Sequence, residues 1–391
     1  MPAPLLALIR LARLKFLAGG LAGGALGTAV AAYETGRADW SAYALAQLAI
    51  SSFHLMTQFA NDYFDRECDA LATPTPYSGG SGVLVSGALP PRAALLAALA
   101  CAAAGGIASV ALMATGRGLA AGTAAAIAVL AWSYSAPPLR LLARGFGEAD
   151  TALVVAVLVP LCAYAAQRHA FDVRAVASTL PAAAAMLAMM LAVEYPDLAA
   201  DAAGGKRNLV VRLGPEGAKP LAIAASTAVY LGVGLALALG APPGFALLEA
   251  LTLPVAIGYA RAVRARPGGD PAADEALAAR GVAFFFLVAA LGALGYAAAP
   301  HATDRTRAAV GSGVIEAASI AERVNAALDA VRPGIHRDGG DVWLVRVEEP
   351  VAYVQMVGAC GGCAMATATL KGAIETAVRD RCPEIERVEA L

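Results

Sequence analysis

Long apolar stretches recur along the first 300 residues and constrain the fold more than any other feature of this chain. We count about nine, each near the length with which an α-helix crosses a bilayer. The composition agrees, because 59% of the residues are hydrophobic and only 15% are charged. The predicted fold class is an all-α multi-span membrane protein in a lipid bilayer, not a large soluble helical bundle. The predicted spans are roughly 12–33, 41–60, 92–115, 118–136, 149–167, 173–195, 219–240, 244–263 and 281–299.

Lysine and arginine are concentrated in alternate connections between these stretches. One set carries Arg66, Arg92, Arg140, Arg144, Lys206, Arg207, Arg212, Lys219, Arg261, Arg264, Arg266 and Arg280, whereas the other carries Arg37, Arg117, Arg168 and Arg174. The positive-inside rule places the first set and the basic N-terminal segment in the cytoplasm, so the predicted location is the cell inner (cytoplasmic) membrane. The first residues are interpreted as the start of a span, not as a cleaved signal. A net charge of −1 gives no reason to expect a nucleic-acid partner.

The character of the chain changes after Pro300. Residues 301–319 read as a polar linker, and residues 320–391 read as a small α/β domain. We predict a helix near 320–332 that ends at Pro333-Gly334, strands at 341–348 and 351–357, a helix near 364–381 and a last strand near 385–390. The predicted domains are therefore 1–300, 301–319 and 320–391.

Two acidic clusters stand at the ends of predicted spans. In the first, Asp62, Asp65 and Asp69 follow Asn61, and their spacing places all three on one face of a helix. The second cluster contains Asp197 and Asp201, with Lys206 and Arg207 beyond a Gly-Gly turn. Carboxylates at the mouth of a membrane segment are a functional-site hypothesis by default. Two such clusters with cations nearby suit a diphosphate bridged by Mg²⁺, whereas the alternative is solvated loop acids at helix ends.

These residues resemble the UbiA superfamily of intramembrane prenyltransferases. Asn61 to Asp69 matches its N-D-x-x-D-x-x-x-D signature, Asp197 and Asp201 match its second acidic motif, and Pro137 to Arg140 matches a third region. The resemblance implies helices around a central cavity, ionisation of a polyprenyl diphosphate and attack by an aromatic acceptor. It implies that Asp62, Asp65, Asp197 and Asp201 bind Mg²⁺, that Asn61 and Asp69 support the first cluster, and that Lys206, Arg207 and Arg140 hold the diphosphate.

The acceptor is less closely defined by the sequence. The glycine-rich run 75–84 and the segment 206–214 look most like 1,4-dihydroxy-2-naphthoate prenyltransferases of menaquinone synthesis. Glu194 departs from the residue usual in that subgroup, so 4-hydroxybenzoate or another aromatic acceptor stays open. His54 lies about two turns before Asp62 and is interpreted as a hydrogen-bonded core residue, with contact to an acceptor hydroxyl as the alternative.

One close cysteine pair, Cys360 and Cys363, lies in the C-terminal region. The spacing alone leaves zinc, redox and iron–sulfur roles open, and two thiolates are half of a tetrahedral set. The pair is predicted to lie between a strand and the start of a helix. Backbone N–H groups at the start of that helix would lower the pKa of the two thiols.

The segment from about Ile320 to Leu391 resembles the NifU C-terminal domain. The matching residues are Arg332-Pro333, the run 338–342 and the run 358–363 that contains both cysteines. The resemblance implies an iron–sulfur scaffold or carrier, in which Cys360 and Cys363 of two chains share a [4Fe–4S] cluster. It also implies a homodimer through this domain, and donor or recipient proteins for the cluster.

The two resemblances leave two hypotheses for the whole chain. The chain is a membrane prenyltransferase with an accessory cluster domain, or an iron–sulfur carrier that the spans anchor. The acidic clusters favour the first, because an anchor does not need them. Nine spans would place the tail outside, whereas cluster assembly belongs in the cytoplasm. We favour a cytoplasmic tail, with 281–299 re-entrant or interfacial; the alternatives are an exported domain and a fusion without a joint mechanism.

Overall fold

The computed structural model describes residues 3–73, 75–77, 79–266, 269–301, 320–337, 340–348, 350–358 and 364–390. The chain divides into two compact units, Met1–Arg305 and Thr306–Leu391. The predicted cluster ligands Cys360 and Cys363 lie outside the described residues.

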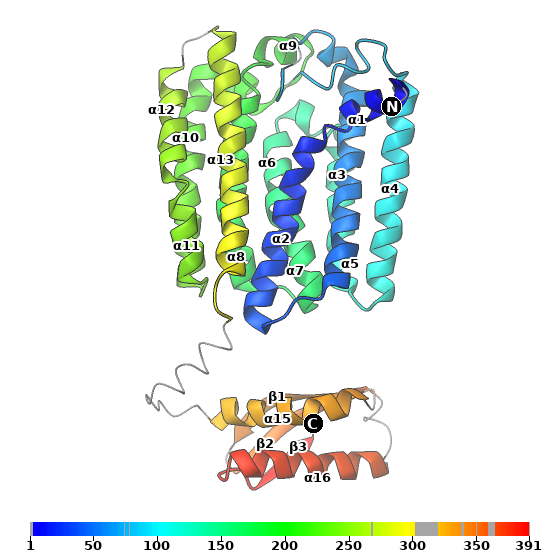
Figure 1. Ribbon diagram of the computed structural model, residues 1–391, viewed down its shortest axis with the longest axis vertical. Coiled ribbons are helices and arrows are strands. Elements are labelled where there is room, and N and C mark those ends of the chain that lie inside the picture. Colours follow the sequence, from blue (N-terminus) through cyan, green and yellow to red (C-terminus); the bar gives the residue numbers. More distant parts are fainter. Residues whose placement is uncertain are drawn as a thin grey trace. The chain divides into compact units, whose positions relative to one another are not determined.

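The first unit is a bundle of helices (Figure 1). Its elements are α1 (Ala3–Leu11), η1 (Leu14–Phe16), α2 (Leu17–Thr35), α3 (Trp40–Asp69), α4 (Pro91–Ala114), α5 (Gly118–Ser133), η2 (Leu142–Arg144), α6 (Gly147–Leu153), the π-helical turn η3 (Val154–Leu158), α7 (Val159–Arg168), α8 (Val173–Val193), α9 (Leu198–Ala203), α10 (Leu209–Ala238), α11 (Pro243–Ala250), α12 (Leu253–Ala265) and α13 (Pro271–Ala297). Large apolar side chains such as Leu96, Ile107 and Leu231 point outward and are exposed, as expected for helices that face lipid.

The prediction of a helical membrane protein is confirmed, but the count of about nine spans is not. Within the described part of the chain, six helical segments are long and apolar enough to cross a bilayer. The pair α11 and α12, bent by 43°, makes a seventh if it is one span. Helix α5 is shorter, with 16 residues, and α3 ends in the first acidic cluster, which lowers its hydropathy.

Close backbone contact between α2 and the α7 segment depends on glycine. A Cβ at Gly27 would overlap the carbonyl oxygen of Pro160, and a Cβ at Gly23 would meet the side chain of Val159. Small residues that let backbones approach are the usual packing device in membranes, where no hydrophobic force acts between helices. Pro160 has no N–H to donate to the preceding turn, which fits the π-helical turn η3 just before it.

Several predicted boundaries differ from the structure. The first predicted span starts at residue 12, but Arg13 has a left-handed backbone (φ 43°) and separates α1 from η1 and α2. Helix α10 begins at Leu209, ten residues before the predicted span, and kinks at Gly214 (φ 73°, ψ 160°). Segment 281–299, interpreted as re-entrant or interfacial, lies in the continuous 27-residue helix α13 up to Ala297. The break in direction is instead between α11 and α12.

The helices of the first unit run alternately up and down. Figure 1 shows α9 and α1 at the upper end of this unit, whereas α13 runs from that end to the lower one. The chain therefore leaves the helical unit at the end opposite to α9.

The second unit has a three-stranded sheet in the order β1-β2-β3. Its elements are α15 (Ile320–Arg337), β1 (Gly340–Glu348), β2 (Val351–Gly358), α16 (Ala364–Arg381) and β3 (Arg387–Ala390). β1 pairs antiparallel with β2 and has an irregularity between Leu344 and Arg346, and β3 pairs parallel with β2. Side chains of both helices and all three strands form one core, which includes Leu328, Val354 and Val388.

The predicted end of the first helix of this unit, at Pro333-Gly334, is wrong. Helix α15 continues to Arg337, because Ile335 is buried in the core beyond the proline. Arg332 also ties this turn to β1: its Nε donates to Asp341 at 3.0 Å and its Nη2 to the carbonyl of Val342 at 2.9 Å. These contacts offset the hydrogen bond that proline cannot donate.

Candidate active site

The two acidic clusters lie far apart in the sequence but meet through one lysine. Asp65 on α3 and Asp201 on α9 are both buried. Lys206 Nζ lies 3.1 Å from Asp65 Oδ2 and 3.2 Å from Asp201 Oδ1. Asn208, at the start of α10, donates from Nδ2 to Asp201 Oδ2 at 2.8 Å. A direct ionic bridge therefore joins the two clusters.

Electrostatics keep the Lys206 ammonium group charged. Burial by itself lowers the pKa of Lys206, but the carboxylates of Asp65 and Asp201 outweigh burial and raise that pKa above its ordinary value. Burial raises the pKa of Asp201, and Lys206 opposes this rise. The ammonium group therefore stays protonated at any physiological pH, as a phosphate-binding cation must.

Arg13 completes the first cluster from the break before α2. Its Nη2 lies 3.0 Å from Asp62 Oδ1 and donates to Asn61 Oδ1, also at 3.0 Å. Asn61 in turn donates from Nδ2 to Asp65 Oδ2 at 2.9 Å and to Ser135 Oγ at 3.0 Å. Asn61 therefore connects Arg13, the first cluster and the segment just after α5.

A glycine-rich loop between α3 and α4 contacts both clusters. The backbone N–H of Gly79 donates to Asp197 Oδ2 at 2.7 Å, and that of Ser81 donates to Asp62 Oδ2 at 3.2 Å. The Ser81 hydroxyl donates to the same Asp62 oxygen. Between them, Gly80 has φ +69°, and a Cβ there would overlap the carboxylate of Asp69. Only glycine fits at position 80, and this explains the close approach of the loop to Asp69.

Among the residues that the structure describes, Arg140 and Arg207, the other two predicted diphosphate ligands, do not contact the acidic clusters. The side chains of Arg140 and Arg207 are exposed. Their loops adjoin, because the backbone N–H of Arg207 donates to the carbonyl of Ala143 at 3.0 Å. Lys206 and Arg13, not these two arginines, contact the acidic residues in the described part of the chain.

Sequence reasoning missed Arg13, Ser81 and Glu148 as site residues. Arg13 belongs to the basic N-terminal segment, which the charge distribution places in the cytoplasm. The buried Glu148 accepts a hydrogen bond from the N–H of Leu209, and Glu194 accepts one from Val210 at 3.5 Å. Both glutamates therefore hold the start of α10, next to Lys206. Two features of the sequence pointed to two of these site residues: Arg13 is a basic residue before an apolar span, and Ser81 is a serine in a glycine-rich loop.

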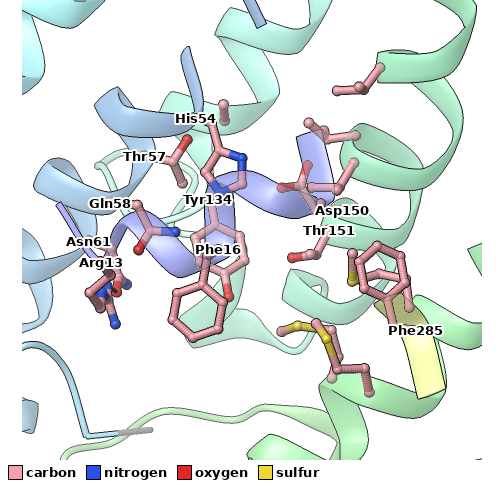
Figure 2. A pocket seen from close by; sticks show the side chains of 18 of the residues that line it. Arg13, Phe16, His54, Thr57, Gln58, Asn61, Tyr134, Asp150, Thr151 and Phe285 are labelled. Atoms are coloured by element: carbon pink, nitrogen blue, oxygen red, sulfur yellow. Dashed lines mark hydrogen bonds between the residues drawn. The ribbon is translucent and has the colours of Figure 1, made fainter. Parts of the chain in front are cut away.

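A cavity of about 220 Å³ opens beside the first cluster (Figure 2). Its polar lining consists of Arg13, His54, Thr57, Gln58, Asn61, Tyr77, Tyr134, Asp150 and Thr151. Most of the remaining lining is apolar and includes Phe16, Ile50, Phe53, Val154, Met189 and Phe285. The cavity thus joins an ionic end to an apolar interior, as a substrate with a charged head and a hydrocarbon tail requires.

The donor set suits a hard divalent cation that is completed by substrate. No three His, Cys, Asp or Glu side chains converge on a single metal position among the described residues. Mg²⁺ does not need such a cage, because it is usually held by one or two carboxylates together with substrate phosphates and water. The carboxylates of the two clusters offer oxygen ligands of this kind, and Lys206 and Arg13 lie beside them.

A helical membrane unit with two ion-paired acidic clusters, and with an apolar cavity beside the first of them, is typical of an intramembrane prenyltransferase. The chain belongs to the UbiA prenyltransferase family, whose family model matches residues 21–288. A solved UbiA homolog from Archaeoglobus fulgidus bound to GPP and Mg²⁺ has a TM-score of 0.56 and 16% identity, covering 73% of this chain and 99% of that chain. A digeranylgeranylglyceryl phosphate synthase has a TM-score of 0.55 and 16% identity, covering 75% and 99%. At this identity the likeness shows the fold alone.

The C-terminal unit contains a NifU-like domain, matched over residues 324–389. NifU-like protein 2 of Arabidopsis thaliana chloroplasts is 38% identical over 78 residues, which are 20% of this chain and 33% of that protein. The nitrogen fixation protein NifU of a Nostoc species is 48% identical over 63 residues, which are 16% and 21%. The chain thus spans about a third or less of these two relatives.

Gly80→Ala tests the contact between the loop and the clusters. We expect kcat/KM for prenyl transfer to fall by about 100-fold, because the methyl group pushes the loop away from Asp69 and breaks the hydrogen bonds to Asp62 and Asp197. Gly87→Ala is the matched control, since Gly87 also has positive φ (+72°) but has nothing within 4 Å of its Cβ position. Equal losses in both variants would show that backbone strain, not the contact, explains the effect.

Proposed function

We propose that this protein transfers a polyprenyl group from a polyprenyl diphosphate to an aromatic acceptor, with Mg²⁺ held by Asp62, Asp65, Asp197 and Asp201. The observation that carries the proposal is the Lys206 bridge between Asp65 and Asp201. Asn61, which donates a hydrogen bond to Asp65, lines the apolar cavity. The UbiA homolog whose structure holds GPP and Mg²⁺ supports this choice of substrate and metal.

The reaction needs positive charge around the diphosphate of the substrate and exclusion of water around its prenyl chain. Bound Mg²⁺ would neutralise charge that develops on the leaving diphosphate. Lys206 and Arg13 add positive charge at the same place, and the exposed Arg140 and Arg207 would contact the outer phosphate oxygens. The allylic C–O bond breaks and the diphosphate leaves with its electron pair. A bond to a ring carbon of the acceptor forms, and the proton of that carbon passes to the released diphosphate or to solvent. The apolar lining holds the prenyl chain and keeps water from the allylic cation.

For the acceptor we propose a quinone precursor of the menaquinone type, 1,4-dihydroxy-2-naphthoate. The support is the glycine-rich loop, which the sequence shares with that subgroup and which here contacts both clusters. An assay of purified protein with geranyl diphosphate, Mg²⁺ and a panel of acceptors tests it. Preferential prenylation of the naphthoate is expected, whereas preference for 4-hydroxybenzoate would reject the naphthoate and no prenylation would reject the function.

For the NifU-like domain we propose an accessory iron–sulfur role. Cys360 and Cys363 of two chains would share a [4Fe–4S] cluster and exchange it with donor or recipient proteins. A membrane-tethered carrier is the alternative for the whole chain. The buried, ion-paired acidic clusters favour the enzyme, because an anchor gains nothing from charges that cost free energy to bury.

We further propose that the active site faces the cytoplasm, as the distribution of arginine and lysine indicates. Helix α13 ends opposite α9, and this favours a tail that leaves on the external side over the cytoplasmic tail that the sequence led us to favour. A topology reporter fused after Ser312 should therefore show an external signal. A cytoplasmic signal would mean that one helical segment does not cross the membrane, and α11–α12 would be the first to test.

A further inference from the structure

Asp150 on α6 is a buried carboxylate that the diphosphate site does not use. Its side chain is 8% exposed, it lines the cavity, and its Oδ1 is buried with no hydrogen-bond partner in the described part of the chain. An unpaired carboxylate oxygen in an apolar setting is costly, and natural proteins rarely keep one without a use. The position therefore requires a hydrogen-bond donor that the described chain does not supply.

Asp150 and its neighbours on α6 and η3 line one wall of the cavity. In Figure 2, Asp150 and Thr151 lie across the cavity from Thr57, Gln58 and Asn61. The π-helical turn η3 follows α6 directly and widens the helix by one residue, so that Val159 lines the same wall as Val154. Such turns are frequent at functional sites.

Among the reactants of the proposed function, only the aromatic acceptor can donate a hydrogen bond to Asp150 Oδ1. The prenyl chain has no donor, and the diphosphate is an anion that a carboxylate repels. An aromatic hydroxyl is a donor of suitable size, and O–H···O⁻ hydrogen bonds are among the strongest in proteins. We propose that Asp150 determines acceptor specificity by accepting a hydrogen bond from a hydroxyl group of the aromatic acceptor. The inference rests on the proposed transferase function and assigns the acceptor's place in the cavity.

The test uses the purified full-length protein with geranyl diphosphate, Mg²⁺, 1,4-dihydroxy-2-naphthoate and the monomethyl ethers of that acceptor. For Asp150→Leu we expect the KM of the acceptor to rise about 10- to 100-fold, the range for loss of a charge-assisted hydrogen bond. The KM of geranyl diphosphate and its hydrolysis without acceptor should stay within about twofold of wild type. Wild type should also prefer the free hydroxyl over one of the ethers, and Asp150→Leu should lose that preference.

Two further variants separate this role from a general effect on folding. Asp150→Asn keeps the shape and a carbonyl acceptor, so its KM should lie between wild type and Asp150→Leu. Glu249→Gln is the matched control, because Glu249 on α11 is also a buried carboxylate with an unpaired oxygen but does not line the cavity. An unchanged acceptor KM in Asp150→Leu, or an equal rise in Glu249→Gln, would overturn the assignment. Wild-type protein that neither hydrolyses nor transfers geranyl diphosphate would instead reject the proposed function itself, and the assignment with it.

Discussion

Prenyl transfer should fall by about 10³-fold or more when either acidic cluster loses one carboxylate, in Asp62→Ala or in Asp197→Ala. Each change removes a proposed Mg²⁺ ligand, and a metal contributes several kcal/mol to charge stabilisation in the transition state. Each also removes the partner of the glycine-rich loop, because Ser81 donates to Asp62 and Gly79 donates to Asp197. The measurement is kcat with saturating acceptor over a Mg²⁺ titration.

The control lies within the same motif. Glu67 is on the same helix as Asp62, but its side chain is 88% exposed and pairs with Arg66. Glu67→Ala should therefore keep wild-type activity, since exposed ion pairs contribute little. Asp62→Asn, which preserves shape, should be inactive yet show the thermal unfolding of wild type in detergent. Full activity of both alanine variants would refute the metal-site assignment.

Anaerobic reconstitution should give the wild-type protein a brown [4Fe–4S] absorbance, and Cys360→Ser should abolish it. A cluster that two chains share loses two of its four thiolates by this single change, because the substitution is present in both copies. Prenyl transfer should stay within about twofold of wild type, because the acidic clusters belong to the other compact unit. Visible absorbance, iron content and transferase activity of the same sample are the measurements.

Cys382 provides the comparison in the same unit. It is fully buried in the core, and burial raises the pKa of its thiol, so it is a poor thiolate ligand. Cys382→Ala should keep the absorbance. An undiminished cluster in Cys360→Ser would reject the proposed ligands, and a parallel loss of transferase activity would show that the two units cooperate.

The sequence predicted the fold class and the presence of two acidic motifs, because both depend on local patterns. Apolar length predicts spans wherever a segment is uniformly apolar, and this worked for α4 and α8. Apolar length predicted the wrong helix boundary where backbone conformation or side-chain burial decides where the helix begins or ends. The break at Arg13 comes from a left-handed residue, and the extension of α15 past Pro333 comes from burial of Ile335.

The site residues that sequence reasoning missed share one property. Arg13 and Ser81 belong to no acidic motif, and each becomes a site residue because folding brings it to Asp62. Asp150 is similar, since a single aspartate near the start of an apolar run gives no sign of the cavity that it faces. Such contacts between distant segments are set by how helices pack, and one sequence does not encode them in any spacing.

The sequence by itself therefore determined that this chain is a helical membrane protein with two acidic motifs and a separate NifU-like domain. Residue type and periodicity suffice for the spans and the acidic motifs, because burying a charge or leaving a backbone group unpaired in lipid costs free energy wherever it occurs. The NifU-like domain follows from its resemblance to that family. The tertiary structure alone decided that Lys206 bridges the two clusters, that the glycine-rich loop contacts both, and that Asp150 faces the cavity. Each of these facts depends on distances between residues far apart in the chain, which only the packing of the helices fixes.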